Sequence, residues 1–210
     1  MRLRYVKNAF EILEENKELV AFNPELNKGK WKEVFNTSGL LSLEVGCGKG
    51  QFLLDNGIAY PTDAFIGLEM MTSVICRAVQ KLKEKDIKNV LLINKDANHL
   101  LEYFSEGEVD KLYLNFPDPW PKARHEKRRL TSMSFLEKYK TILSKDGTIR
   151  FKTDNLDLYN YSLENFSKVL EEGFMFGESI LKDGDIQTEF ETKYRLNGKT
   201  IYYIEGKFKR

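Results

Sequence analysis

Two spacings of apolar residues alternate along this chain, and they predict strands and helices in turn. Short apolar runs of strand length are followed by segments in which apolar residues recur every three or four positions. The runs that predict strands are residues 40–45, 64–69, 90–93, 109–114 and 147–152. Helices are predicted between and after them, for example from Val74 to Leu82 and from Tyr159 to Leu170. Because strands and helices alternate from residue 40 to 170, we predict a mainly parallel, doubly wound α/β sheet with helices on both faces.

The two ends of the chain depart from this alternation. Residues 1–38 are rich in lysine, arginine and glutamate, and we interpret them as an N-terminal basic extension that precedes a single domain of residues 39–210. One helix is predicted in the extension, from about Ala9 to Val20. The cations around Trp31 are compatible with contact to nucleic acid, and equally with a tryptophan that packs on the core. At the other end, residues 174–181 and 200–208 predict a pair of strands that closes the sheet.

Composition and charge exclude several classes of protein. A chain of 210 residues with 41% hydrophobic content can bury one substantial core. Its net charge is only +1, so any basic surface must be local. The longest aliphatic run, residues 90–93, is far shorter than a membrane span, and the two cysteines and two histidines are scattered without metal-ligand spacing. We therefore expect a cytoplasmic protein with no metal and no membrane partner.

A glycine-rich loop follows the first predicted strand. It reads G-C-G-K-G over residues 46–50, at the place where open α/β sheets bind their ligands. An acidic residue also stands at or just past the end of each of the first four strands: Glu44, Glu69, Asp96 and Asp118. Because the carboxyl ends of parallel strands share one edge of a sheet, we expect these four acids in one site.

The order of these glycines and acids indicates the cofactor. A dinucleotide fingerprint has the spacing G-x-G-x-x-G, whereas this chain has G-x-G-x-G. Glu44, two residues before Gly46, would repel a pyrophosphate but attract a cation. S-adenosyl-L-methionine carries an ammonium and a sulfonium and no phosphate, so we predict it as a methyl donor, with S-adenosyl-L-homocysteine as the product. Glu69 suits the ribose hydroxyls, and Asp96 suits the adenine amine.

A proline-rich loop and a basic segment follow the fourth predicted strand. The loop is N-F-P-D-P-W-P, residues 115–121, and its three prolines in five residues prevent helix or sheet from continuing. It presents one carboxylate, Asp118, and one indole, Trp120. The next eight residues, 122–129, contain five cations: Lys122, Arg124, Lys127, Arg128 and Arg129. Cations fixed directly behind a rigid loop of this kind predict an anionic partner that is delivered to the loop.

Several motifs resemble those of a known family. E-V-G-C-G-K-G at residues 44–50 resembles the first motif of class I S-adenosylmethionine methyltransferases. N-F-P-D-P-W-P-K followed by R-H-E-K-R-R-L closely resembles the tRNA (guanine-N7)-methyltransferases, and T-D-N at 153–155 and T-E-F-E at 188–191 match later motifs of that family. The resemblance runs from about residue 40 to the end. It implies a Rossmann-like methyltransferase sheet of seven strands, one of them antiparallel.

The resemblance also implies an activity and the residues that carry it. The expected reaction is methyl transfer to N7 of a guanine in the tRNA variable loop, guanine 46 in the family. Asp118 would be the catalytic residue. The residues expected to contact the methyl donor are Glu44, Gly46, Gly48, Glu69, Asp96 and Asp118. Those expected to contact the target nucleotide are Lys122, Asp154, Thr188, Glu189, Phe190 and Glu191. Those expected to contact RNA are Arg124, His125, Lys127, Arg128 and Arg129. The sequence leaves the oligomeric state open between a monomer and a homodimer.

Three other functions stay open from the residues alone. A methyltransferase for the exocyclic amine of adenine would carry an Asn/Asp-Pro-Pro-aromatic loop, and here Asp118 stands where the stacking aromatic would be. A nicotinamide-dependent dehydrogenase is disfavoured by the glycine spacing. A non-catalytic tRNA-binding module would have no use for a cofactor pocket with four acids.

Overall fold

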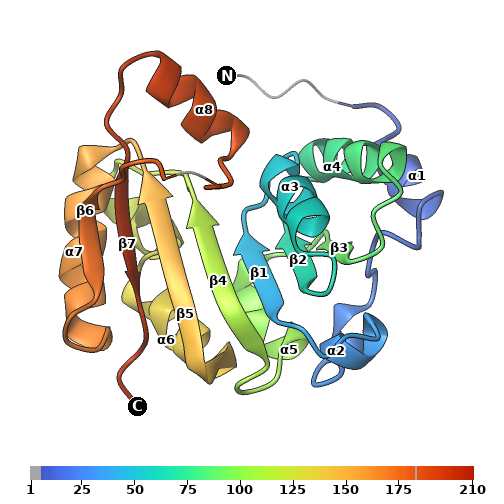
Figure 1. Cartoon of the computed structure of the whole chain (residues 1–210), viewed down its shortest axis with the longest axis horizontal. Helices are drawn as coiled ribbons and strands as arrows, with labels where there is room; N and C mark the ends of the chain where they lie inside the picture. Colours follow the sequence, from blue (N-terminus) through green and yellow to red (C-terminus); the bar gives the residue numbers. More distant parts are fainter. Residues whose placement is uncertain (1–5, 183) are drawn as a thin grey trace.

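The computed structural model describes residues 6–182 and 184–210, and over these residues it contains one sheet of seven strands in the order β3-β2-β1-β4-β5-β7-β6 (Figure 1). The strands are β1 Leu41–Val45, β2 Ala64–Leu68, β3 Val90–Ile93, β4 Val109–Asn115, β5 Leu143–Thr153, β6 Met175–Glu178 and β7 Tyr202–Gly206. Strands β1 to β5 pair in parallel, and β7 pairs antiparallel with both β5 and β6. The predicted mainly parallel sheet of seven strands is therefore confirmed.

Helices connect the strands and lie on both faces of the sheet. They are α1 Ala9–Glu14, α2 Trp31–Val34, α3 Gln51–Ala59, α4 Thr72–Glu84, α5 Leu100–Tyr103, α6 Met133–Ile142, α7 Leu156–Val169 and α8 Glu189–Leu196, with short 3₁₀ turns η1 Pro24–Asn27, η2 Ala97–His99 and η3 Ala123–Arg128. The Asn155 side chain caps α7 by accepting a hydrogen bond from the Leu158 N–H at 2.8 Å.

The alternation of side chains along each strand builds two separate apolar layers. Leu43, Ile66 and Leu112 belong to the layer under α5, α6 and α7, whereas Phe65 and Leu92 belong to the layer under α1, α3 and α4. Helices α3 and α4 lie over the half of the sheet formed by β1, β2 and β3 (Figure 1). On the same face, the other half carries a row of polar side chains in register: Tyr113, Arg150 and Glu205.

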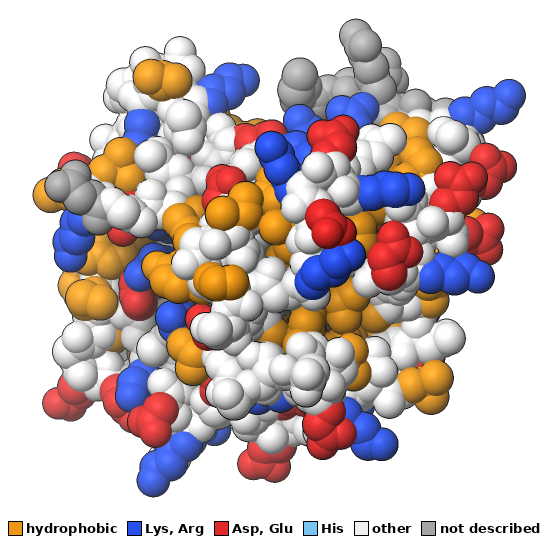
Figure 2. Space-filling view, turned by 45° about the vertical axis from the view of Figure 1, so that its right-hand side comes forward, with side chains coloured by type: hydrophobic (Ala, Val, Ile, Leu, Met, Phe, Trp, Pro, Cys, Tyr) orange, Lys and Arg blue, Asp and Glu red, His pale blue; other side chains and the backbone are white. Residues whose placement is uncertain are grey.

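Charged side chains of both signs are interspersed on the face of the molecule that Figure 2 shows. This distribution agrees with a net charge of only +1 for the whole chain. A surface of this kind provides little long-range attraction for RNA as a whole, so attraction must come from local groups of cations.

The N-terminal segment packs against the domain. The helix predicted from about Ala9 to Val20 is shorter than expected, because α1 ends at Glu14. Leu92 of β3 then pairs with the chain instead: its N–H donates to Leu19 O at 2.8 Å, and its carbonyl accepts from Ala21 N–H at 2.9 Å. This pairing satisfies the backbone of the edge strand and competes with helix continuation. The division of the chain at residue 38 stays a prediction.

Trp31 belongs to the core. Its side chain is fully buried, its indole N–H donates to the Tyr103 carbonyl at 2.9 Å, and its ring packs on Phe104 with centroids 5.7 Å apart. Of the two interpretations that the sequence allowed, packing on the core is therefore confirmed. Stacking of Trp31 on nucleic acid is wrong, because no face of the indole is accessible.

The buried Trp31 leads to a stability prediction. Trp31→Ala should lower the free energy of unfolding by roughly 3–5 kcal/mol, because it leaves a cavity and an unpaired Tyr103 carbonyl. Urea unfolding measures this change, with Leu26→Ala as the control because Leu26 is 72% exposed. A loss no larger than that of the control would contradict the assignment of Trp31 to the core.

Candidate active site

One cavity of about 720 Å³ opens at the carboxyl-end edge of the sheet, and the four predicted acids all line it. Glu44 comes from the end of β1, Glu69 follows β2, Asp96 follows β3 and Asp118 follows β4. The structure thus brings together side chains that are up to 74 residues apart in the sequence, counted from 44 to 118. Their contacts with a methyl donor stay a prediction.

The glycine loop forms one wall of this cavity. Gly46 and Gly48 have φ values of 79° and 57°, a left-handed conformation that favours glycine over other residues. The Gly46 N–H donates to Leu68 O at 2.7 Å, and the Gly48 N–H donates to Glu69 Oε2 at 3.2 Å. The loop is therefore bonded directly to the end of β2, which fixes both glycines at the cavity wall.

Glu44 is the most buried of the four acids, with only 3% of its surface exposed. Its Oε1 accepts a hydrogen bond from Asn115 Nδ2 at 2.8 Å, whereas its Oε2 has no partner among the described residues. Burial is the main cause that raises the pKa of Glu44 to about 8, and the nearby Glu69 carboxylate contributes to the same shift. A buried carboxylate with one unpaired oxygen at a cavity wall fits a cationic ligand group, such as the ammonium of S-adenosylmethionine.

Glu69 and Asp96 are held by backbone amides. Glu69 Oε1 accepts from the Met71 N–H at 2.9 Å, while its Oε2 accepts from the Gly48 N–H. Burial raises the pKa of Glu69 above its ordinary value. Asp96 caps η2, because its Oδ1 accepts from the Asn98 N–H at 2.8 Å. These bonds orient the two carboxylates without using charged partners, so they can still accept from hydroxyl or amine groups of a ligand.

The proline loop is strained at two positions. Phe116 and Trp120 have φ values of 52° and 41°, a region that non-glycine residues rarely adopt, at a cost of about 1–3 kcal/mol each. The surrounding structure holds them there: the Phe116 N–H donates to Lys152 O at 2.8 Å, and the Trp120 carbonyl accepts from Arg129 Nη2 at 3.1 Å. Asp118 lies between these two positions, exposed to solvent at the cavity.

Three of the residues predicted to contact the target nucleotide line the cavity: Thr188, Glu189 and Phe190. They begin α8, which lies over the carboxyl-end edge of the sheet (Figure 1). Thr188 caps this helix by accepting from the Glu191 N–H at 3.0 Å, and Glu189 pairs with Lys81 at 2.5 Å. The Phe190 side chain remains 54% exposed.

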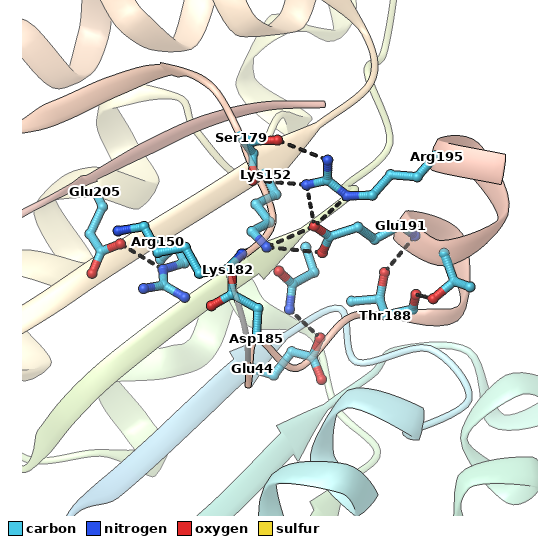
Figure 3. A network of polar contacts seen from close by, with 12 residues as sticks. Glu44, Arg150, Lys152, Ser179, Lys182, Asp185, Thr188, Glu191, Arg195 and Glu205 are labelled. Atoms are coloured by element: carbon cyan, nitrogen blue, oxygen red, sulfur yellow. Dashed lines mark hydrogen bonds and ion pairs between the residues drawn. The ribbon is translucent and has the colours of Figure 1, made fainter. Parts of the chain in front are cut away.

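The structure places the other three outside the cavity lining: Lys122, Asp154 and Glu191. Asp154 pairs with Lys199 at 2.6 Å, and Lys122 is exposed. Glu191 is 1% exposed and points toward Lys152 and Arg195, with ion-pair distances of 2.9 Å and 2.7 Å (Figure 3). Its two oxygens are therefore occupied in fixing α8 to β5, which argues against its predicted contact with the nucleotide.

The predicted RNA-contacting residues form η3 and its C-terminal flank. Lys127 and Arg128 line the cavity, and the Arg128 guanidinium lies over the Trp120 ring at 5.0 Å. His125 packs edge-on against the same ring at 5.5 Å, and Arg124 is exposed. Arg129 differs from the others, because its guanidinium is bonded to the proline loop. Contact with RNA stays a prediction for all five.

Asn115 and Phe116 are among the cavity residues that the sequence prediction misses. Asn115 orients Glu44, and Phe116 packs with Phe190 and Tyr194 at centroid distances of 6.5 Å and 5.7 Å. Their position at the start of the proline loop was the available signal. Their partners lie more than 70 residues away in the sequence, so the local sequence gave no sign of these contacts.

Among the described residues, no group of three or more histidine, cysteine, aspartate or glutamate side chains could hold a metal ion. In the same residues, no helix is both long enough and apolar enough to cross a bilayer.

Comparison with known proteins decides the family. A family model described as "Putative methyltransferase" matches residues 38–204. The tRNA (guanine-N(7)-)-methyltransferase of Bacillus cytotoxicus is 44% identical over 100% of this chain and 98% of the relative, and that of Streptococcus mutans is 43% identical over 99% and 100%. The chain belongs to the tRNA (guanine-N7)-methyltransferase family. The predicted resemblance is therefore confirmed.

The tRNA (guanine-N7)-methyltransferase family uses S-adenosylmethionine, which confirms the predicted cofactor. The fold agrees, since a solved structure titled as a SAM dependent methyltransferase from Aquifex aeolicus matches with a TM-score of 0.56. That match covers 97% of this chain and 98% of the solved chain at 14% identity, so it bears on the fold alone. The acids and glycines of the cavity are suited to this cofactor: Glu44 to its ammonium, Glu69 to its ribose and Asp96 to its adenine amine.

The raised pKa of Glu44 leads to a prediction about stability and pH. Without cofactor, the folded protein keeps this proton up to about pH 8, whereas the unfolded chain releases it near 4.5. The folded state therefore binds more protons between these values, and its free energy of unfolding falls as the pH rises through this range, by on the order of a few kcal/mol.

Glu44→Gln should abolish this contribution. Denaturant unfolding at pH values between about 5 and 8 should show wild type losing stability relative to Glu44→Gln as the pH rises. Glu172→Gln, which changes an exposed glutamate, is the matched control and should follow wild type. Parallel curves for wild type and Glu44→Gln would contradict the raised pKa.

Proposed function

We propose that this chain transfers a methyl group from S-adenosylmethionine to N7 of a guanine in the variable loop of tRNA, guanine 46 in the family. The observation that carries the proposal is one cavity that joins the acids of the glycine loop to Asp118 on the proline loop. The relatives named for this activity match over the full chain at 43–44% identity. Because tRNA is the substrate, we also propose a cytoplasmic location.

Binding of the methyl donor is assigned to the two loops after β1 and β2. Glu44 accepts from the amino group, Glu69 accepts from the ribose hydroxyls, and Gly46 and Gly48 let the backbone approach the ligand closely. The donor supplies an activated methyl group on a sulfonium. The cation also stabilises the ionised form of Glu44, which burial and, to a smaller extent, the Glu69 carboxylate otherwise disfavour.

The chemistry at guanine N7 requires positioning and charge stabilisation. N7 has an unprotonated lone pair at neutral pH, so no base is needed before it attacks the methyl group. Positive charge then develops on the purine, and a fixed carboxylate such as Asp118 stabilises it. Alignment of N7, methyl and sulfur provides the remaining acceleration, which suits a loop whose backbone is held at both ends.

Recognition of the guanine is assigned to the residues between the proline loop and α8. Phe116 and Phe190 line the cavity and offer aromatic faces, and stacking on such a face contributes about 1–3 kcal/mol per base. Glu189 is the α8 carboxylate in the cavity lining. Its Oε1 pairs with Lys81 at 2.5 Å, so we assign to its Oε2 a bond from one of the two donors on the guanine edge, N1–H or the exocyclic amine, in place of Glu191. Adenine does not offer this pair of donors.

Attachment of the tRNA is assigned to the exposed cations behind the loop. Lys122, Arg124, Lys127 and Arg128 are exposed, and we assign to them the contacts with phosphates near the target nucleotide. A guanine in a folded tRNA must leave its stack to reach Asp118, at a cost of a few kcal/mol. The phosphate contacts offset this cost, so folded tRNA should be a far better substrate than a free nucleoside. Whether one copy or two of the chain bind it stays a prediction.

Asp118→Asn tests the catalytic role. The change keeps the size of the side chain and removes its charge, so kcat should fall by on the order of a hundredfold or more, with little change in tRNA affinity. Single-turnover methyl transfer and filter binding measure the two quantities. Asp146→Asn, which changes an exposed carboxylate elsewhere on the surface, should leave both unchanged. Near-normal turnover in Asp118→Asn would refute the role.

Replacing the target guanosine by 7-deazaguanosine tests the acceptor atom. The analogue lacks the N7 nucleophile but keeps the Watson–Crick edge, so the modified tRNA should still bind and compete with normal tRNA. Methyl transfer to it should be absent. Transfer that persists on the analogue would contradict the N7 assignment and would favour an exocyclic amine as the acceptor.

A further inference from the structure

Arg129 turns away from solvent and back toward the proline loop. Its Nε donates to Pro119 O at 3.1 Å and to Trp120 O at 3.3 Å, and its Nη2 donates to Trp120 O at 3.1 Å. The guanidinium also lies over the ring of Tyr161 on α7, 4.3 Å from the centroid. The side chain is therefore held from two directions by residues of the protein itself.

This arrangement separates Arg129 from the other cations of the basic segment. Arg124, Lys127 and Arg128 are exposed, whereas Arg129 is half-buried. A guanidinium has five N–H donors in a planar fork, and here two of its three nitrogens, Nε and Nη2, already donate to carbonyl oxygens. The geometry therefore does not favour a phosphate contact by Arg129, whereas Lys127 and Arg128 line the cavity.

The carbonyls that Arg129 holds follow Asp118 directly in the chain. Trp120, the second of them, has the strained φ of 41°, and at the other end of the loop Phe116 has a φ of 52° and donates to Lys152 O at 2.8 Å. Residues persist in such conformations only when the surrounding structure over-determines them. The five-residue loop from Phe116 to Trp120 is thus fixed at its start by β5 and at its end by Arg129.

We infer that Arg129 is a positioning residue for the methyl transfer: its guanidinium fixes the Pro119 and Trp120 carbonyls and thereby holds the Asp118 carboxylate in place. This inference rests on the proposed function for its kinetic consequence, but the contact between Arg129 and the loop does not. Lysine cannot replace it, because an ammonium is a point donor without the planar fork that meets two successive carbonyls and stacks on Tyr161.

Turnover provides the first test. In Arg129→Lys, kcat should fall by on the order of tenfold to a hundredfold, because a small displacement of a catalytic group has effects of this size, while KM for tRNA stays close to wild type. The matched control is Arg210→Lys. Arg210 also donates to carbonyls, those of Lys140 at 3.2 Å and Leu143 at 2.7 Å, but it lies outside the cavity, so its loss should leave kcat unchanged.

The salt dependence of tRNA binding provides the second test. Loss of a phosphate contact should flatten the slope of log K against log salt by roughly 0.7–0.9. Arg124→Gln should show this change, whereas Arg129→Gln should keep the wild-type slope and lose turnover. A flattened slope with normal kcat in Arg129→Gln would make Arg129 an RNA contact and overturn the inference.

Fluorescence provides a test that is independent of activity. The chain has two tryptophans, and Trp31 is fully buried, so quenching by acrylamide reports mainly on Trp120. Quenching should increase in Arg129→Lys and Arg129→Gln and not in Arg210→Lys. If the wild-type protein has no guanine N7 activity and quenching still increases in the Arg129 variants, the proposed function is refuted but the role of Arg129 in the loop is kept. Unchanged quenching and unchanged kcat in both Arg129 variants would overturn the inference.

Discussion

The alignment of parallel strands is the constraint on which this site depends. Strands β1, β2 and β4 end at the same edge of the sheet, so the loops that follow them meet, and their acids must share one cavity. Carboxylates gathered in this way repel one another, and burial raises the pKa of Glu44 to about 8. The Glu44 Oε2 has no partner among the described residues, so it is free to accept from a cationic ligand group. The positive charge of a bound methyl donor therefore compensates the repulsion between the carboxylates that the fold brings together.

Strand β5 connects the proline loop to the helix over the cavity. The Lys152 carbonyl accepts from the Phe116 N–H, and the ammonium of the same residue pairs with Glu191 of α8 at 2.9 Å. Arg195 pairs with Glu191 from the other side, and its Nη1 donates to Ser179 O at 2.8 Å (Figure 3). A buried carboxylate with two cationic partners is costly to break, because either partner lost leaves an uncompensated charge. The position of α8, and of the Phe190 side chain that it carries, thus depends on a residue of the central sheet.

The sequence was sufficient to predict the sheet, the glycine loop and the four acids, because each depends on local spacing or on the shared edge of parallel strands. It was insufficient where a side chain's partner lies far along the chain. The short α1 depends on pairing of residues 19–21 with Leu92, and the burial of Trp31 depends on Tyr103. Likewise, the motif that contains Glu191 gives no sign that Lys152, 39 residues earlier, occupies its carboxylate. Motif resemblance identifies which residues matter, but not which of them face the ligand.

The central claim is that this cavity delivers guanine N7 to the methyl donor. The most direct measurement is incubation of the protein with labelled S-adenosylmethionine and unmodified bulk tRNA, followed by digestion and separation of the nucleosides. The account predicts that the label appears as 7-methylguanosine and that a single site per accepted tRNA, in the variable loop, is labelled. Label in a methylated adenosine, or in a guanosine methylated on an exocyclic atom, would contradict it.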